Sequence, residues 1–147
     1  MEIIEVMENK KNYIELLLLA DEQEDMIDRY IDKGKMYVLD DNGIKCECVV
    51  IDVGNGVLEI TNIATIPEYQ GKGYAKAMID FIITKNREEY STLQVGTGDS
   101  PMTIPFYEKC GFVRSHIAPN FFTDNYDHPI YEGGIQLVDM VYLRKSF

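Results

Sequence analysis

The 147-residue sequence has no tryptophan, three cysteines and two histidines, and it has no long apolar run. The longest run is LLLLA at Leu16–Ala20, far short of the roughly 20 residues that a membrane-spanning helix requires. The opening segment MEIIEVMENKK carries acidic residues where an export signal would carry basic ones. We therefore expect a cytoplasmic protein with no membrane partner.

Basic residues and cysteines are both scarce. Fourteen Lys and Arg stand against 25 Asp and Glu, a net charge of -11, whereas a nucleic-acid-binding surface needs clustered Lys and Arg. The balance argues against a nucleic-acid partner and is compatible with a cationic substrate.

Cys46 and Cys48 lie two apart in a strand-like run, and no second Cys or His pair has ligand spacing. We expect core thiols here, with no disulfide framework and no metal.

A chain of this length is of the size of one domain and can bury roughly two-thirds of its unfolded surface. We therefore expect a single domain over residues 1–147. Apolar periodicity and turn residues predict the elements along it. They are a strand at 2–6, helices at about 10–20 and 22–33, three antiparallel strands between 35 and 66, a helix at 72–85, a strand at 91–98, a short helix at 102–110, a strand at 111–118, a polar loop at about 119–133 and a final strand at 134–143. This order predicts a mixed sheet with helices on its faces.

A glycine-rich turn, QGKGYA at residues 70–75, lies between a predicted strand and a predicted helix. Such a turn can hold a phosphate, because the first N–H groups of a helix are unpaired and its dipole favours an anion. The Walker pattern fails, since Lys72 lies between two glycines with no Ser or Thr after it. The dinucleotide pattern fits Gly71 and Gly73 but has Lys76 at its third glycine. A plain tight turn without a ligand is the other alternative.

QGKGYA also matches the pattern [RQ]-x-x-G-x-[GA], with Gln70, Gly73 and Ala75 at the defining positions. This pattern is the signature of the GNAT acetyltransferase superfamily. A second segment, IPFYEKCGF at residues 104–112, is similar to the later Y-E-K-x-G-F element of that superfamily. The predicted order of elements resembles the GNAT fold over essentially the whole chain. The resemblance implies an α/β (α+β) fold whose mixed, mostly antiparallel sheet has six to seven strands, splayed central strands and helices on both faces.

The resemblance further implies acetyl transfer from acetyl-CoA, the cosubstrate, to an amine. The pyrophosphate would lie on backbone N–H groups of the turn, and the strand before the turn would pair with the pantetheine arm and polarise the thioester carbonyl. Gly96 and Gly98 would weaken pairing of the next strand, as a splayed site tolerates. Many family members contact CoA through an Asn where this chain has Ser100. The expected cosubstrate contacts are Ile63, Ala64, Thr65, Ile66, Gln70, Gly71, Lys72, Gly73, Tyr74, Ala75 and Ser100.

Two residues are expected to carry the proton transfers. By resemblance, Tyr107 is the general acid that protonates the leaving thiolate, and its alternative role is that of a buried aromatic residue. The acceptor amine must lose a proton, because an alkylamine with a pKa near 10 is an ammonium at neutral pH. Glu59 matches a strand position from which some family members supply the base, and it equally fits an ordinary exposed strand glutamate. His116 and His128 have no partner motif, and we expect structural or surface roles for both.

The acceptor side is the least informative part of the sequence. Residues Asn120–Gly134 combine aromatic rings with carboxylates, which suits a cationic amine. They equally suit a loop that covers a sheet edge or a homodimer contact. Cys110 has no paired histidine in sequence and is expected to be a packed thiol, which favours direct transfer without a covalent intermediate. Two functions remain open: an N-acetyltransferase acting on a primary amine of a small cationic acceptor, and a non-catalytic acyl-CoA-binding sensor on the same fold.

Overall fold

Two asparagine-glycine turns organise the strands in the N-terminal part of the chain. At Asn42-Gly43 and at Asn55-Gly56 both residues have positive φ angles, the conformation that tight hairpins favour. The three antiparallel strands predicted between residues 35 and 66 are confirmed, and these two turns connect them. With one further strand they form an antiparallel sheet in the order β1-β2-β3-β4, made of β1 (Glu2–Val6), β2 (Lys35–Asp40), β3 (Ile44–Gly54) and β4 (Val57–Thr65).

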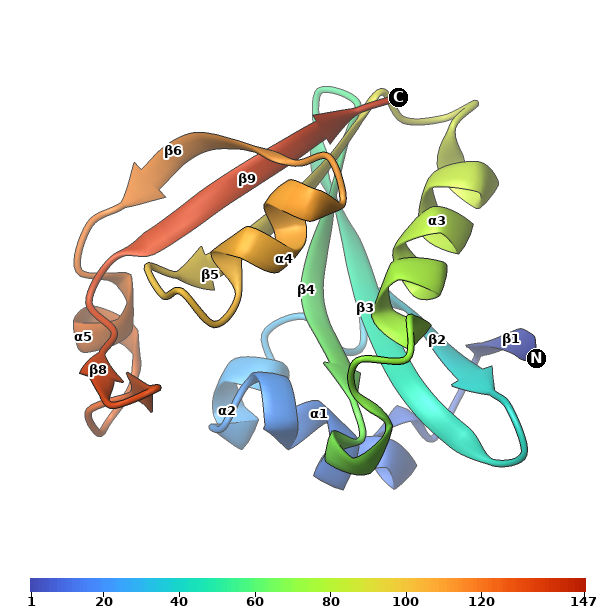
Figure 1. The fold of residues 1–147 in the computed structure, drawn as a ribbon, viewed down its shortest axis with the longest axis horizontal. Helices are drawn as coiled ribbons and strands as arrows, with labels where there is room; N and C mark the ends of the chain where they lie inside the picture. Colours follow the sequence, from blue (N-terminus) through green and yellow to red (C-terminus); the bar gives the residue numbers. More distant parts are fainter. The chain divides into compact units, whose positions relative to one another are not determined.

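The computed structural model describes all residues 1–147, drawn in Figure 1, and divides into two units, Met1–Ser91 and Thr92–Phe147. The first unit contains the four strands above and the helical elements that cover them. No helix of the structure combines the length and the apolar character needed to cross a membrane. The helical elements of the first unit are η1 (Lys10–Tyr13), α1 (Ile14–Ala20), α2 (Glu24–Ile27), η2 (Pro67–Tyr69) and α3 (Tyr74–Asn86).

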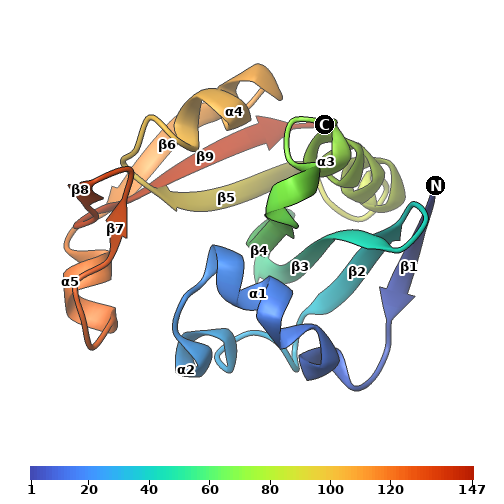
Figure 2. The same ribbon diagram turned by 60° about the horizontal axis from the view of Figure 1, so that its bottom comes forward.

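Helices cover both faces of the sheet in the first unit. Successive residues of a strand point to opposite faces, and β2 follows this rule. Met36 and Val38 join a buried cluster with Leu17 of α1, whereas Tyr37 contacts Phe81 of α3, with ring centroids 5.3 Å apart. Figure 2 shows α1 and α3 on opposite sides of these strands. The prediction of helices on both faces is confirmed for this unit.

The second predicted helix is shorter than the sequence indicates. Helix α2 ends at Ile27, and the chain continues in turns, in which the N–H of Tyr30 donates to the carbonyl of Ile27 and that of Gly34 to the carbonyl of Tyr30. The predicted range 22–33 is therefore wrong beyond Ile27. The spacing of Met26, Ile27, Tyr30 and Ile31 did identify buried residues, because consecutive turns also bring positions three and four apart to one side.

The second unit contains three antiparallel strands in the order β5-β9-β6. Its strand β5 pairs with β9 along its whole length, from Thr92 opposite Ser146 to Gly98 opposite Met140. A Cβ atom at Gly96 would lie 2.5 Å from Sδ of Met140, and the one at Gly98 would lie 2.6 Å from the side chain of Leu137. These glycines therefore make room for neighbouring side chains. The weaker pairing predicted for a splayed site concerns the other edge of β5 and stays a prediction.

The segment predicted as a loop at 119–133 has structure of its own. It contains a short helix and one strand of a two-stranded hairpin, and Phe122, Ile130 and Leu137 form a small buried cluster around them. The final strand begins at Met140, not at 134, because Ile135 and Gln136 belong to that hairpin. The elements of the second unit are β5 (Thr92–Gly98), α4 (Ile104–Lys109), β6 (Val113–Ala118), α5 (Phe121–Asn125), β7 (Tyr131–Glu132), β8 (Ile135–Gln136) and β9 (Met140–Ser146).

The predicted fold class is confirmed. The first unit has a four-stranded sheet and the second has a three-stranded one, all of the pairings within each unit are antiparallel, and both units combine strands with helices. The predicted splay of the central strands concerns how the two units meet, and it stays a prediction.

Candidate functional site

The glycine turn lies in the first unit, at the start of α3. Gly71 and Gly73 have φ angles of 78° and 87°, and a Cβ atom at either position would have no heavy atom within 4 Å. Glycine adopts this left-handed conformation freely, and the open space lets a ligand approach the backbone. Gly73 is the N-cap residue of α3 and no side chain caps the helix. The first turn of α3 therefore presents unpaired N–H groups at the positive end of the helix dipole.

The backbone of β4 before the turn divides into two sets of groups. The N–H of Ile66 donates to the carbonyl of Lys45 on β3 at 2.9 Å. Residues of an antiparallel pair alternate between facing the partner strand and facing away from it, so Ala64 and Ile66 turn their N–H groups toward β3. Ile63 and Thr65 turn theirs away. Of the four strand residues predicted to contact the pantetheine arm, Ile63 and Thr65 have the backbone groups to do so.

Side chains around the turn hold it against the strands. The Nε2 of Gln70 donates to the carbonyl of Thr65 at 3.3 Å. The hydroxyl of Tyr74 donates to Oδ2 of Asp41 at 2.7 Å, and this hydrogen bond raises the pKa of Tyr74. Gln70 and Tyr74 therefore fix the position of the turn, and the half-buried Ala75 follows at the start of the helix.

Two lysines lie at the same place. The Nζ of Lys72, which belongs to the turn, is 5.6 Å from the ring centroid of Tyr69. The Nζ of Lys45 is 4.2 Å from the same centroid. Lys45 was missed by the sequence reasoning, because only the register of β3 against β4 brings it to a turn more than 20 residues further on. A lysine directly after an Asn-Gly hairpin is the one sequence signal for it.

Glu59, the predicted base, lies on β4 opposite Ile51 of β3 and is partly buried. This setting suits a carboxylate that is reachable from solvent, so it agrees with either of the two roles left open by the sequence. It differs from Glu47 on the neighbouring strand β3, whose side chain is fully buried.

Glu47 adjoins a buried polar chain that sequence reasoning did not find. Neither of its carboxyl oxygens has a hydrogen-bond partner, and burial raises its pKa well above the usual range. On the same face of the sheet, Asn62 Nδ2 donates to the hydroxyl of Tyr30 at 3.0 Å, and that hydroxyl donates to Asp21 at 2.9 Å. The Oδ1 of Asn62 is also buried without a partner.

Tyr107 and Ser100 belong to the second unit. Tyr107 lies on α4, is 7% exposed and packs edge-on against Phe106 and Phe112, with ring centroids 5.2 and 5.7 Å away. Ser100 is buried in the loop before α4, where its Oγ accepts the N–H of Met102 at 3.0 Å. The predicted site residues thus fall into two groups, one in each unit, and Tyr107 has the aromatic packing that the sequence allowed.

The remaining cysteines and histidines occupy the settings that we expected. All three cysteines are buried, and burial raises the pKa of Cys46 to about 11. The expectation of packed thiols is confirmed. His116 is exposed and stacks on Tyr142, with ring centroids 4.6 Å apart, and His128 is exposed beside Asp127.

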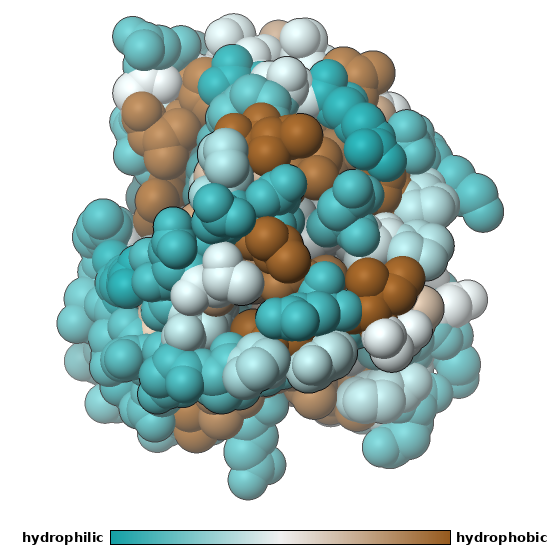
Figure 3. All heavy atoms as spheres, turned by 90° about the vertical axis from the view of Figure 1, so that its left-hand side faces the viewer, coloured by the Kyte–Doolittle hydropathy of each residue, from teal (hydrophilic) through white to brown (hydrophobic).

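The aromatic residues of Asn120–Gly134 pack mainly on one another. Phe122 is buried and stacks on Tyr126 with centroids 5.7 Å apart, and Phe121 meets both rings edge-on. Glu132 is partly buried, and this burial raises its pKa. Figure 3, which views the side where α5 and β8 lie, shows apolar residues in several patches separated by polar ones. The segment therefore has a small core of its own, and its predicted roles toward an acceptor or a second copy stay predictions.

Comparison with known proteins gives the same assignment in sequence and in structure. Residues 32–114 match the acetyltransferase (GNAT) domain family. The chain is 34% identical over 139 residues to the uncharacterized N-acetyltransferase YvbK of Bacillus subtilis (strain 168), covering 92% of this chain and 90% of that protein.

Three solved structures are similar over nearly the whole chain. A GNAT family acetyltransferase from Elizabethkingia anophelis with acetyl-CoA bound has a TM-score of 0.92 and 33% identity, covering 99% of this chain and 97% of its own. The IAA acetyltransferase from Bacillus cereus ATCC 14579 has a TM-score of 0.89 and 31% identity, covering 99% and 100%. A Bacillus subtilis acetyltransferase in complex with CoA has a TM-score of 0.88 and 33% identity, covering 99% and 98%.

These relatives confirm, at the level of the family, the prediction of an acetyltransferase that uses acetyl-CoA. The domain match covers both motifs that carried the resemblance, the turn at 70–75 and the segment at 104–112. The chain belongs to the GNAT acetyltransferase family.

Proposed function

We propose that this protein is an N-acetyltransferase that transfers acetyl from acetyl-CoA directly to a primary amine of a small cationic acceptor. The observation that carries the proposal is the turn before α3, where Gly71 and Gly73 are open to a ligand and no side chain caps the helix. The CoA pyrophosphate lies on the backbone N–H groups of residues 71–75 in this proposal. Their partial positive charge and the absence of side chains at the two glycines support it.

The pantetheine arm follows β4 in this proposal. Ile63 and Thr65 turn their backbone groups away from β3, as the pairing of Ile66 with Lys45 implies. An N–H of this pair polarises the thioester carbonyl and stabilises the oxyanion that forms on attack. One such donor typically contributes about 3 kcal/mol of transition-state stabilisation.

The chemistry then needs one base and one acid. Glu59 takes a proton from the acceptor ammonium, and the freed amine attacks the thioester carbon. The carbon–sulfur bond breaks, and the hydroxyl of Tyr107 protonates the leaving thiolate. The nitrogen loses its second proton as the amide forms, and this proton returns through solvent to the tyrosinate. Ser100 contacts CoA through its O–H, which is still able to donate although its oxygen accepts the N–H of Met102.

The charge of the chain supports a proposal for the acceptor, and its length supports a proposal for a single domain. A net charge of -11 favours a cationic amine over an anionic one, and the carboxylates within Asn120–Gly134 supply local negative charge on the second unit. We further propose that both units together form one catalytic domain, residues 1–147, that acts in the cytoplasm without nucleic acid and pairs as a homodimer.

A steady-state assay tests the proposal. Purified protein is incubated with acetyl-CoA and a panel of polyamines, aminoglycosides, amino acids and peptides, and release of free thiol is followed against a control without amine. Turnover with at least one amine supports an N-acetyltransferase. Tight CoA binding in calorimetry without turnover on any amine contradicts it and favours the acyl-CoA-binding sensor instead.

A further inference from the structure

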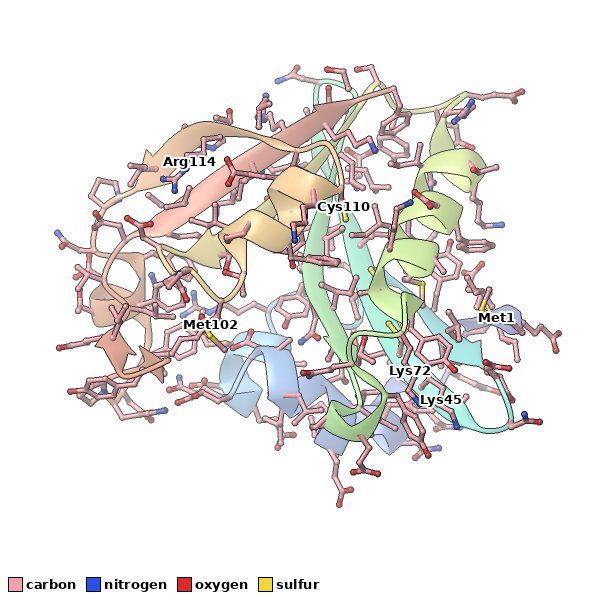
Figure 4. The ribbon with its side chains drawn as sticks, in the orientation of Figure 1. Met1, Lys45, Lys72, Met102, Cys110 and Arg114 are labelled. Atoms are coloured by element: carbon pink, nitrogen blue, oxygen red, sulfur yellow. The ribbon has the colours of Figure 1, made fainter.

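Lys45 occupies an unusual position for a lysine. It follows the β2–β3 hairpin, and its side chain is so covered that the residue is only 8% exposed. Its ammonium donates to the carbonyl of Asn42 at 3.0 Å and lies 4.2 Å from the ring centroid of Tyr69. Lys72 approaches the same ring. Figure 4 shows both lysines together beside the start of α3, so one aromatic ring holds two cationic groups.

The carboxylates of the neighbouring hairpin form hydrogen bonds with other groups. Asp40 accepts the N–H of Gly43 and Asp41 accepts the hydroxyl of Tyr74. Neither Lys45 nor Lys72 takes part in an ion pair. Both ammonium groups lie over one aromatic ring, and a covered ammonium with one hydrogen bond still has two donors to satisfy. An anion bound at these ammonium groups would supply acceptors and the opposite charge.

We propose that Lys45, together with Lys72, binds a phosphate group of CoA, with the Tyr69 ring holding the two ammonium groups in place. The inference rests on the proposed function, because it places the cosubstrate at the adjoining turn. Lysine binds phosphate oxygens through charge-assisted hydrogen bonds. The pair makes the protein selective for phosphorylated thioesters over thioesters that carry pantetheine alone.

Lys45 adds a selectivity for ligands that the backbone of the turn does not have. Backbone N–H groups in the turn bind any anion at a helix start, whereas Lys45 reaches the site from a neighbouring strand and fixes a second point of charge. CoA offers two kinds of phosphate with the same chemistry, the pyrophosphate and the 3′-phosphate of its ribose. A ligand series that removes them one at a time separates the two.

Isothermal titration calorimetry of the full chain tests the proposal, with Lys45→Met, Lys45→Arg and Lys72→Met as variants. Lys85→Met is the matched control, because Lys85 is exposed on the last turn of α3, at the end of the helix far from the turn. We expect Lys45→Met to weaken CoA binding by about 10-fold or more, and Lys72→Met to weaken it as well. Lys45→Arg and Lys85→Met should bind CoA with an affinity within about 3-fold of the wild type. The apparent loss should shrink as salt is raised.

The series of CoA, 3′-dephospho-CoA and pantetheine identifies which phosphate of CoA the two lysines bind. Equal losses for CoA and 3′-dephospho-CoA assign the lysines to the pyrophosphate, and a loss for CoA alone assigns them to the 3′-phosphate. Unchanged CoA affinity in a folded Lys45→Met protein overturns the inference, as does an equal loss for pantetheine, which has no phosphate. If the wild type itself does not bind CoA, the proposed function fails first, so the two failures are distinguishable.

Discussion

Glu47 is a buried carboxyl group beside polar side chains that leave it without a partner. Its residue is 0% exposed, and both of its oxygens lack hydrogen bonds. An isolated carboxylate in the interior is very costly, so the group is held in its protonated form instead. The neutral acid can donate one O–H, and the unpartnered Oδ1 of Asn62 on the same face is an acceptor. The contribution of Glu47 to the free energy of unfolding therefore depends on pH, whereas that of an exposed glutamate does not.

Replacing Glu47 by Gln should make stability less sensitive to pH. The pKa of Glu47 in the folded protein is raised well above its unfolded value. As the pH rises above about 4.3, the unfolded chain loses this proton while the folded protein keeps it, so the free energy of unfolding falls by up to about 1.4 kcal/mol per pH unit until the folded pKa is reached. Glu47→Gln removes this loss, and its advantage over the wild type should grow between pH 4.5 and 7.

Urea unfolding at several pH values measures this difference. The control is Glu8→Gln at an exposed position, whose stability should follow the wild type at every pH. Parallel profiles for Glu47→Gln and the wild type would show that the carboxyl ionises equally in both states.

Replacing Tyr107 by Phe should remove the acid and leave the packing. The two edge-on contacts with Phe106 and Phe112 involve the ring, which phenylalanine keeps. We expect kcat to fall by about 10-fold or more, in line with the contribution of general acid catalysis, while the Kd for CoA changes by less than about 2-fold. Steady-state kinetics with the best amine and calorimetry with CoA measure the two effects.

Tyr90→Phe is the control for the loss of a hydroxyl group, since Tyr90 donates to Asp52 in the first unit and has no proposed part in transfer. A Tyr107→Phe enzyme with unchanged kcat would assign the tyrosine to packing alone.

At the scale of elements, local chemistry decided what the sequence could predict. Positive-φ asparagine and glycine residues fix the two hairpins of the first unit, and these turns are visible as Asn-Gly pairs. The end of α2 at Ile27 has no such marker, because the buried positions that follow keep helical spacing. The sequence predicts loop for the first strand of the hairpin Tyr131–Gln136 and assigns its second strand to the final strand, since these strands have two residues each and show no alternation.

The candidate site was predictable to a similar degree. Gly71 and Gly73 could be assigned from the sequence, because a motif and a conformation coincide there. Lys45 could not, since it reaches Tyr69 only through the pairing of β3 with β4. Asn62 could not, since its partners Leu17 and Tyr30 lie more than 30 residues earlier in the chain. Of the four residues 63–66 expected to contact the pantetheine arm, the alternation of hydrogen bonds singles out Ile63 and Thr65. That alternation depends on a register that the sequence does not specify.

A substitution in the turn should separate ligand binding from backbone strain. Gly73→Glu places a carboxylate where we propose the pyrophosphate, and the φ angle of 87° also costs an L-residue about 1 to 2 kcal/mol. Gly54 in the β3–β4 hairpin has a φ angle of 89° and equally open surroundings. Gly54→Glu should therefore lose a similar amount of stability and still bind CoA, whereas Gly73→Glu should weaken CoA binding by about 100-fold or more.

Chemical unfolding and calorimetry on both variants make this comparison. Retained CoA affinity in Gly73→Glu would mean that the phosphates lie elsewhere, and a loss of affinity in Gly54→Glu would trace the effect to general destabilisation.

At the scale of the whole molecule, charge and local cation placement act over different distances. A net charge of -11 opposes the approach of an anionic cosubstrate at long range, but at physiological salt charges beyond roughly 8 Å are screened. Lys45 and Lys72 lie beside the turn, and neither is neutralised by an ion pair. The acidic surface remains available to favour the cationic acceptor that we propose. In this proposal one chain receives partners of opposite charge.

The two units should unfold together and respond to CoA together. The second unit, Thr92–Phe147, is shorter than the roughly 60 residues at which isolated domains become marginal, and it has no disulfide to compensate. We therefore expect one calorimetric transition with equal calorimetric and van't Hoff enthalpies. Acetyl-CoA at 100 times its Kd should stabilise the folded state by about 2.7 kcal/mol and raise the Tm of that single transition by roughly 5 to 10 °C. Two resolved transitions, or a shift of only one of them with acetyl-CoA, would show that residues 1–147 do not form one domain.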